Sequence, residues 1–171
     1  MDPVVLIVDD NDDNRFTLSM RLETCGYSNI LTAEDGREAL DKMRSDPVDL
    51  VLLDIMMPEL DGYGVLEEMR ADTALRDIPV VMISALEDIN CVVRCIELGA
   101  TDYLTKPFNP VLLKARVDNC IEKARYKAQE AAYLARVESE RRRADELLTT
   151  VLPLLDRPRP EAQQPARTAT L

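Results

Sequence analysis

Short runs of apolar, β-forming residues alternate with stretches of helical periodicity, and this alternation restricts the chain to the α/β class. Three of the runs are almost continuously apolar, as expected for parallel strands that are covered on both faces. Five β/α units with right-handed crossovers predict an open, doubly wound, five-stranded parallel sheet. The predicted strands are VVLIV (4–8), NILTA (29–33), DLVLL (49–53), PVVMI (79–83) and TDYL (101–104).

Turn residues separate these strands from four predicted helices. Gly26 and Gly99 stand where helices should end in a left-handed cap. Either Asp12 or Asp13 is expected to cap the N-terminus of the first helix, because carboxylates accept hydrogen bonds from free helical N–H groups. The apolar spacing predicts helices over residues 13–25, 36–45, 63–71 and 88–98.

The pattern changes after Pro107, where helix-forming residues dominate and Gly is absent from residues 109–152. We expect one long helix there, with an interrupted heptad spacing typical of a weak coiled coil. One register runs through Val117, Ile121, Ala124, Ala128 and Ala131, and a second through Ala144, Leu148 and Val151. The predicted organisation is an α/β domain over residues 1–123, a helical or coiled-coil extension over 124–153 and a disordered tail over 154–171.

Charge is unevenly divided. Residues 1–113 hold 9 Lys/Arg and 23 Asp/Glu, a net charge of −14, while residues 114–171 hold 12 and 9, a net charge of +3, which together give the −11 of the whole chain. The acidic part argues against binding to nucleic-acid phosphates. The basic residues 141–143 have acidic neighbours, so we expect a solvated helix face rather than a nucleic-acid or membrane contact.

Cysteine and hydropathy patterns favour a cytoplasmic protein. The four cysteines lack C-x-x-C spacing, and the absence of His excludes a mixed Cys/His zinc site. Cys91 and Cys95 are expected to be reduced and to pack as small apolar residues. No apolar run reaches the roughly 18 residues of a membrane span, and the opening MDPVVLIVDD lacks the basic region of a signal peptide.

Polar residues at the strand ends are the strongest functional signal. Asp9 and Asp10 follow the first predicted strand, Asp54 the third and Ser84 the fourth, and Lys106 lies after the fifth. Because the carboxyl ends of parallel strands meet at one edge, three carboxylates should crowd together and require a cation. Oxygen ligands at an open site favour Mg²⁺, and the set suits transfer of a phosphoryl group to a carboxylate.

These motifs identify the region as similar to the receiver domain of bacterial two-component response regulators. The resemblance covers about residues 3–123 and implies a flavodoxin-like sheet in the order 2-1-3-4-5. It is specific because separate motifs occur in the right order, one for each functional strand end. They are VVLIVDDNDDNR (4–15), LVLLDIMMPELDGYGVLEEMR (50–70), IPVVMISALE (78–87) and GATDYLTKPFNP (99–110).

The resemblance implies a role for each site residue. Asp54 would accept phosphate from a histidine kinase or a phosphotransfer protein. Asp10, Asp54 and the backbone carbonyl of Met56 would bind Mg²⁺, with Asp9 assisting through water. Ser84 and Lys106 would contact the phosphoryl group, and Tyr103 would be the switch aromatic. Lys106 and Pro107 would form a cis-proline junction.

Taken singly, these residues have simpler interpretations: an isolated aspartate can be a helix cap, Lys106 a surface lysine and Tyr103 a half-buried strand residue. Their combination favours the phosphorylation switch.

Met56 and Leu86 stand two residues after Asp54 and Ser84, on the expected path of the hydrolytic water. Slow self-dephosphorylation, with no other enzymatic activity, is therefore expected.

Two outputs remain open. The first is a stand-alone response regulator that forms a homodimer through its C-terminal helix and through the face made by helix four, strand five and helix five, which the resemblance implies. The second is the regulatory part of a receiver-linked nucleotide cyclase or serine phosphatase. It is suggested by residues 139–153, SERRRADELLTTVLP, which resemble the signalling helix that precedes such output domains.

Overall fold

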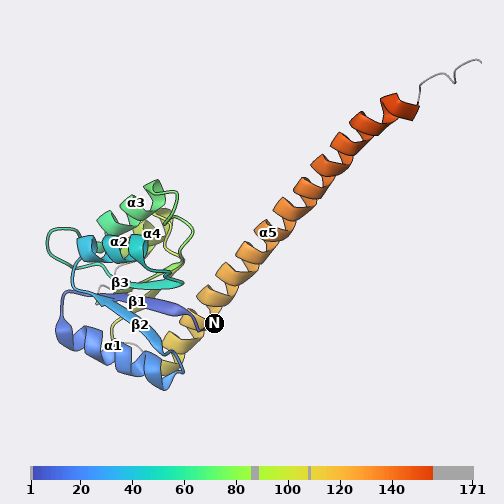
Figure 1. The fold of residues 1–171 in the computed structure, drawn as a ribbon. Coiled ribbons are helices and arrows are strands. Elements are labelled where there is room, and N and C mark those ends of the chain that lie inside the picture. Colours follow the sequence, from blue (N-terminus) through green and yellow to red (C-terminus); the bar gives the residue numbers. More distant parts are fainter. Residues whose placement is uncertain (1, 86–88, 108, 156–171) are drawn as a thin grey trace, which may run out of the picture. The chain divides into compact units, whose positions relative to one another are not determined.

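The structure is a computed structural model that describes residues 2–85, 89–107 and 109–155. It contains a parallel sheet with the strand order β2-β1-β3-β4-β5 and alternating helices, which confirms the predicted fold class (Figure 1). The strands are β1 (Val4–Val8), β2 (Asn29–Ala33), β3 (Leu50–Asp54), β4 (Val80–Ser84) and β5 (Asp102–Thr105). The helices are α1 (Asp12–Thr24), α2 (Gly36–Ser45), α3 (Gly62–Ala71), α4 (Ile89–Glu97) and α5 (Pro110–Leu155).

Helices cover both faces of the sheet, so two hydrophobic cores form (Figure 1). One core packs α2, α3 and α4 against one face, and the other packs α1 and the first turns of α5 against the opposite face. All residues of β3 and β4 are buried, which explains their nearly uninterrupted apolar sequences.

Helix caps follow the predicted turns with one correction. Gly26 and Gly99 have φ angles of 97° and 96°, the left-handed conformation expected after a helix. The predicted N-cap of α1 was wrong. Asn11, rather than Asp12 or Asp13, caps this helix, and its side-chain oxygen accepts hydrogen bonds from the backbone N–H groups of Asp13 and Asn14. The aspartates instead lie in the first turn, where negative charge favours the helix dipole.

The chain divides into two compact units after Ala128. In the first unit, Val117 and Ile121 are buried in the core on the α1 side of the sheet, so the first two positions of the predicted heptad register do not belong to a coiled coil. In the second unit, α5 continues to Leu155, and every side chain of residues 129–152 is exposed. No helix in the described part of the chain is both long and apolar enough to span a membrane.

Candidate functional site

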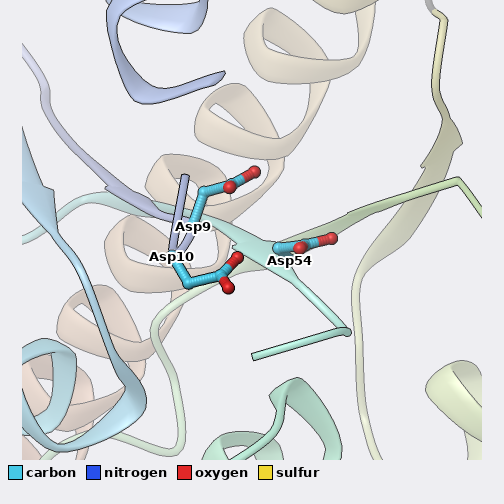
Figure 2. Close-up of side chains that lie close together, drawn as sticks. All are labelled: Asp9, Asp10 and Asp54. Atoms are coloured by element: carbon cyan, nitrogen blue, oxygen red, sulfur yellow. The ribbon is translucent and has the colours of Figure 1, made fainter. Parts of the chain in front are cut away.

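Three carboxylates gather at the carboxyl edge of the sheet. Asp9 and Asp10 follow β1, and Asp54 is the last residue of the neighbouring strand β3 (Figure 2). One carboxylate oxygen from each side chain lies within 4.8 Å of the others. Asp9 and Asp54 are buried, whereas Asp10 is exposed. This is the juxtaposition expected from the strand ends, with one solvent-facing side.

Asp9 is held by a dense set of donors. Its Oδ1 accepts hydrogen bonds from the backbone N–H of Asn11 at 3.0 Å and from the side-chain amide of Asn14 at 3.0 Å, and that amide also lies 3.2 Å from Oδ2. Arg15 donates to the backbone carbonyl of Asp9 at 2.6 Å. The Asp9 side chain is therefore fixed in place by the start of α1, a contribution of Asn14 that the sequence motifs did not reveal.

Lys106 brings a positive charge to the same edge. Its Nζ lies 2.7 Å from Oδ2 of Asp9 and 3.5 Å from Oδ1 of Asp54. The lysine side chain is 20% exposed, so its charge is only partly screened by water. Lys106 thus offsets part of the repulsion among the carboxylates.

The surroundings of Asp54 disfavour the ionised form of its carboxyl group. Burial is the main cause that raises its pKa, and the nearby charge of Asp9 raises it further, while Lys106 lowers it. A hydrogen bond from the backbone of Ile55 also lowers the pKa. The net direction is upward, which means that the folded protein holds the ionised carboxylate at a cost unless more positive charge arrives.

The backbone beside Asp54 depends on Gly62, the first residue of α3. A Cβ on Gly62 would lie 2.3 Å from the carbonyl oxygen of Asp54 and 2.9 Å from Cα of Ile55, much closer than real contacts allow. The N–H of Gly62 donates to the carbonyl of Ile55 at 2.9 Å. A larger residue would therefore push α3 away from the strand end that carries Asp54.

Ser84 and Tyr103 meet beside the carboxylates. Ser84 is completely buried at the end of β4, and its backbone carbonyl accepts a hydrogen bond from Lys106 N–H at 2.8 Å. Tyr103, on the adjacent strand β5, is 8% exposed and forms a side-chain hydrogen bond with Ser84. The ring therefore lies inward and is more buried than an ordinary half-exposed strand residue.

Two further predicted features lie at this edge. The peptide bond between Lys106 and Pro107 is cis, the isomer that the resemblance implies. Met56 follows Asp54 by two residues and is 64% exposed, so its side chain faces solvent near the phosphoacceptor candidate. Leu86, its predicted counterpart after Ser84, lies outside the described residues.

Comparisons with known proteins agree with this geometry. The model of the response regulator receiver domain family matches residues 5–118. A probable transcriptional regulator ycf27 from Cyanidium caldarium is 46% identical over 119 residues, which cover 70% of this chain and 46% of the relative. The alkaline phosphatase synthesis transcriptional regulatory protein PhoP of Bacillus subtilis is 40% identical over 117 residues, which cover 68% and 48% of the two chains. The chain thus spans a little under half the length of these curated relatives.

Solved structures share the same fold. The chemotaxis protein CheY4 of Vibrio cholerae is 31% identical with a TM-score of 0.66, and the match covers 70% of this chain and 99% of that one. NtrX from Brucella abortus is 31% identical with a TM-score of 0.71, covering 78% of this chain and 30% of that one.

Proposed function

The chain belongs to the response regulator receiver family, and from this premise we propose that Asp54 accepts a phosphoryl group in a two-component phosphorelay. The observation that carries the proposal is the meeting of Asp9, Asp10 and Asp54 within 4.8 Å, with Lys106 beside them. Asp54 is the acceptor of choice because it ends a central strand and has Lys106 at 3.5 Å, close enough to act on a group attached to it.

The donor set fits Mg²⁺, since it offers only hard oxygen ligands at an edge that opens to solvent. The oxygens of Asp9 already accept hydrogen bonds from Asn11, Asn14 and Lys106. We therefore assign direct coordination to Asp10 and Asp54, and an assisting role through water to Asp9. The backbone carbonyl of Met56 is the further ligand that the family resemblance implies. The bound ion would supply positive charge that neutralises the carboxylates and the incoming phosphoryl group.

The protein's own residues have separate roles in this transfer. A carboxylate oxygen of Asp54 attacks the phosphorus of the donor, and the bond from phosphorus to the donor nitrogen breaks. Lys106 moves its ammonium group from Asp9 toward the phosphoryl oxygens, and the Ser84 hydroxyl hydrogen-bonds one of them. Because Ser84 also bonds Tyr103, a movement of the serine would change the packing of the ring, which makes Tyr103 the reporter of phosphorylation.

We expect the phosphorylated state to be long-lived, and self-dephosphorylation to be the only further reaction. Hydrolysis requires a water molecule in line with the Asp54–phosphorus bond. We expect the exposed thioether of Met56, two residues after Asp54, to lie on that side of the site, where it offers no group that could orient the water. A phosphoryl half-life of only seconds would contradict this part of the proposal.

A histidine kinase or a phosphotransfer protein is the proposed donor. The outer face of α1 exposes Phe16 (67%) and Met20 (52%), an apolar surface on which a donor protein can dock. A cavity of about 390 Å³ links this helix to the site; its lining residues are Asn14, Thr17, Leu18, Arg21, Ala85, Lys106 and Pro107.

We further propose that the response regulator forms a homodimer. The α4/β5/α5 face exposes apolar side chains on α4 and at the start of α5, namely Ile89, Val93, Ile96, Val111 and Leu112. Within the second unit, Ala144, Leu148 and Val151 keep heptad spacing and are all exposed. Burial of both surfaces in a dimer would remove apolar area from water.

A second candidate output is the regulatory part of a receiver-linked nucleotide cyclase or serine phosphatase. It is favoured by the continuation of α5 through residues 139–153, the segment that resembles a signalling helix. In either case the receiver chemistry is the same. Sequencing of the complete gene distinguishes the two outputs, because a catalytic domain encoded downstream would establish the second.

Phosphorylation with a small-molecule donor tests the function directly. The protein is incubated with phosphoramidate and Mg²⁺, and intact-protein mass spectrometry should detect one added phosphoryl group. Asp54→Asn should remove it, whereas the matched variant Asp13→Asn, which changes an exposed carboxylate in the first turn of α1, should retain it. Phosphorylation of Asp54→Asn at the wild-type level, or none in the wild type, would overturn the assignment.

A further inference from the structure

A second charged cavity lies at the edge of the sheet opposite the carboxylates. It has a volume of about 270 Å³ and is bordered by the residues that precede β4 and β5, so it sits at the amino ends of these strands. It receives side chains from the end of α3, the α3–β4 loop, the α4–β5 loop and α5. We call it the basic cavity after its charged lining residues, which are Arg70, Arg76, Asp77, Lys123 and Lys127.

Cations dominate this cavity. Arg70, Arg76, Lys123 and Lys127 face a single carboxylate, that of Asp77. Oδ1 of Asp77 lies 2.9 Å from Nζ of Lys127, and Oδ2 lies 3.9 Å from Nε of Arg76. One negative charge is therefore paired with two cations. The excess of three positive charges is notable because residues 1–113 as a whole carry a net charge of −14. An anion would therefore be attracted to this place on an otherwise acidic domain.

Arg70 lines the basic cavity, and two hydrogen bonds hold its guanidinium group in place. Its guanidinium donates to the backbone carbonyls of Arg76 and Gly99, the latter at 2.5 Å. A Cβ on Gly99 would lie 2.6 Å from Nε of Arg70, so the glycine makes room for the guanidinium as well as adopting a positive φ. No carboxylate lies within ion-pair distance of Arg70 among the described residues, and its buried Nε makes no hydrogen bond.

We propose that the basic cavity binds a small phosphate-bearing ligand. A phosphate group matches the available donors, since it can accept hydrogen bonds from guanidinium and ammonium groups at once. The volume accommodates a phosphate with a modest substituent. Because Arg70 is already held by hydrogen bonds, ordering its side chain adds little to the entropic cost of binding. This inference does not depend on phosphorylation of Asp54, because the two sites lie at opposite edges of the sheet.

Binding would have a mechanical consequence. Lys123 and Lys127 belong to α5, and Arg76 belongs to the loop before β4. A ligand that bridges them would hold this part of α5 against the sheet more firmly than the exposed Lys127–Asp77 pair does alone. The ligand would thereby influence the helix segment immediately before the second unit.

Calorimetry with inorganic pyrophosphate tests the proposal. The titration uses the full chain in metal-depleted buffer, with Asp54→Asn as the parent, so that a metal-bridged contact with the acidic site cannot contribute. The double variant Arg76→Ala/Lys123→Ala should weaken binding at least about tenfold, the loss expected for two charged hydrogen bonds. The matched double variant Lys114→Ala/Arg136→Ala, with the same charge change elsewhere, should bind as the parent does.

Each outcome is decisive. Loss of binding confined to the cavity variant, together with weaker binding at higher salt, supports the site. Equal weakening in both double variants would show nonspecific attraction and overturn it, as would failure of pyrophosphate to bind the parent. Circular dichroism of the variants verifies that they are folded. Preference for an acidic peptide over pyrophosphate would replace the small ligand with a protein partner.

Discussion

Lys106 Nζ and Asp9 Oδ2 lie 2.7 Å apart although the residues are separated by 97 positions in the sequence. The Asp9 carboxylate is 1% exposed, so the ion pair joins the end of β1 to the segment after β5 in a poorly solvated place. Lys106 also lies 3.5 Å from Asp54. One lysine therefore balances two carboxylates.

Replacing Lys106 should destabilise the protein in the absence of Mg²⁺. In Lys106→Met the buried Asp9 loses its cation, and we expect a loss of about 1–3 kcal/mol in the free energy of unfolding. Lys114→Met is the control, because its partner Asp118 lies at a similar 2.8 Å but is 45% exposed, and it should cost clearly less stability than Lys106→Met. Urea denaturation measures both, and equal losses would contradict the argument.

Mg²⁺ should stabilise the wild type by binding only to the folded state. At a free concentration about ten times the Kd, the gain should be about 1.4 kcal/mol. Asp10→Asn replaces an exposed carboxylate of the proposed ligand set, so the variant should fold normally and lose most of this gain. Thermal unfolding with increasing MgCl₂ gives the result. An unchanged magnesium response in Asp10→Asn would remove that residue from the proposed ligand set.

The fold and the location of the site could be predicted because both depend on short-range patterns. Each strand lies within one residue of its predicted range, and the buried strands β1, β3 and β4 are continuous apolar runs bounded by turn residues. Once the strands are parallel, topology alone brings Asp9 and Asp54 to one edge. The sheet order came from the family resemblance and could not have been derived from the pattern itself.

Other features depend on which surfaces meet in three dimensions. Val117 and Ile121 continue a heptad pattern, but the same spacing also suits packing against a sheet, and here they are buried in the core. Asn11 caps α1 although two aspartates follow it, because the chain turns one residue earlier than the charges suggested. The bonds from Asn14 to Asp9 likewise depend on how α1 begins, which periodicity does not specify.

The Asp118 carboxyl should make the free energy of unfolding depend on pH. Burial would raise the pKa of this carboxyl, but hydrogen bonds from Lys114 and Tyr27 outweigh burial and lower it. A lowered pKa adds stability above the unfolded value of about 3.9 that is lost as the pH falls through the folded value. Asp118→Asn should therefore cost about 0.5–1 kcal/mol near pH 7, a small figure because the group is partly exposed, and progressively less as the pH falls below about 3.9.

The comparison for Asp118 is Asp41→Asn, an 81% exposed carboxylate that is 3.7 Å from Arg44 and should have little effect at either pH. Urea denaturation at a series of pH values separates the two. If the Asp118→Asn defect did not shrink at all as the pH fell below about 3.9, the carboxylate would not be acting through its charge.

The four cysteines should react in two classes. Cys25 and Cys91 are partly exposed, whereas Cys95 and Cys120 are buried, and burial raises the pKa of Cys120 to about 11. Because the thiolate is the reactive form, iodoacetamide near pH 8 should modify Cys25 and Cys91 at least about tenfold faster. Peptide mapping reads the sites, and labelling in urea should equalise them. Rapid modification of Cys120 in the folded protein would show that α5 does not remain packed on the core.

The second unit provides the test of dimerisation. Leu148 is 57% exposed and occupies the centre of the register formed by Ala144, Leu148 and Val151. Leu148→Glu places a charge in the proposed helix–helix contact and should weaken a dimer by about 1–3 kcal/mol, roughly 5- to 150-fold in Kd, without affecting the receiver core. Thr149→Glu adds the same charge one residue away, outside that register, and should leave the dimer intact.

Light scattering coupled to size-exclusion chromatography, with and without beryllofluoride and Mg²⁺, determines the mass. If wild type and Leu148→Glu are both monomers in both conditions, α5 acts as a solvated spacer. If both are dimers, the α4/β5/α5 face carries the association, since that surface is unchanged in the variant.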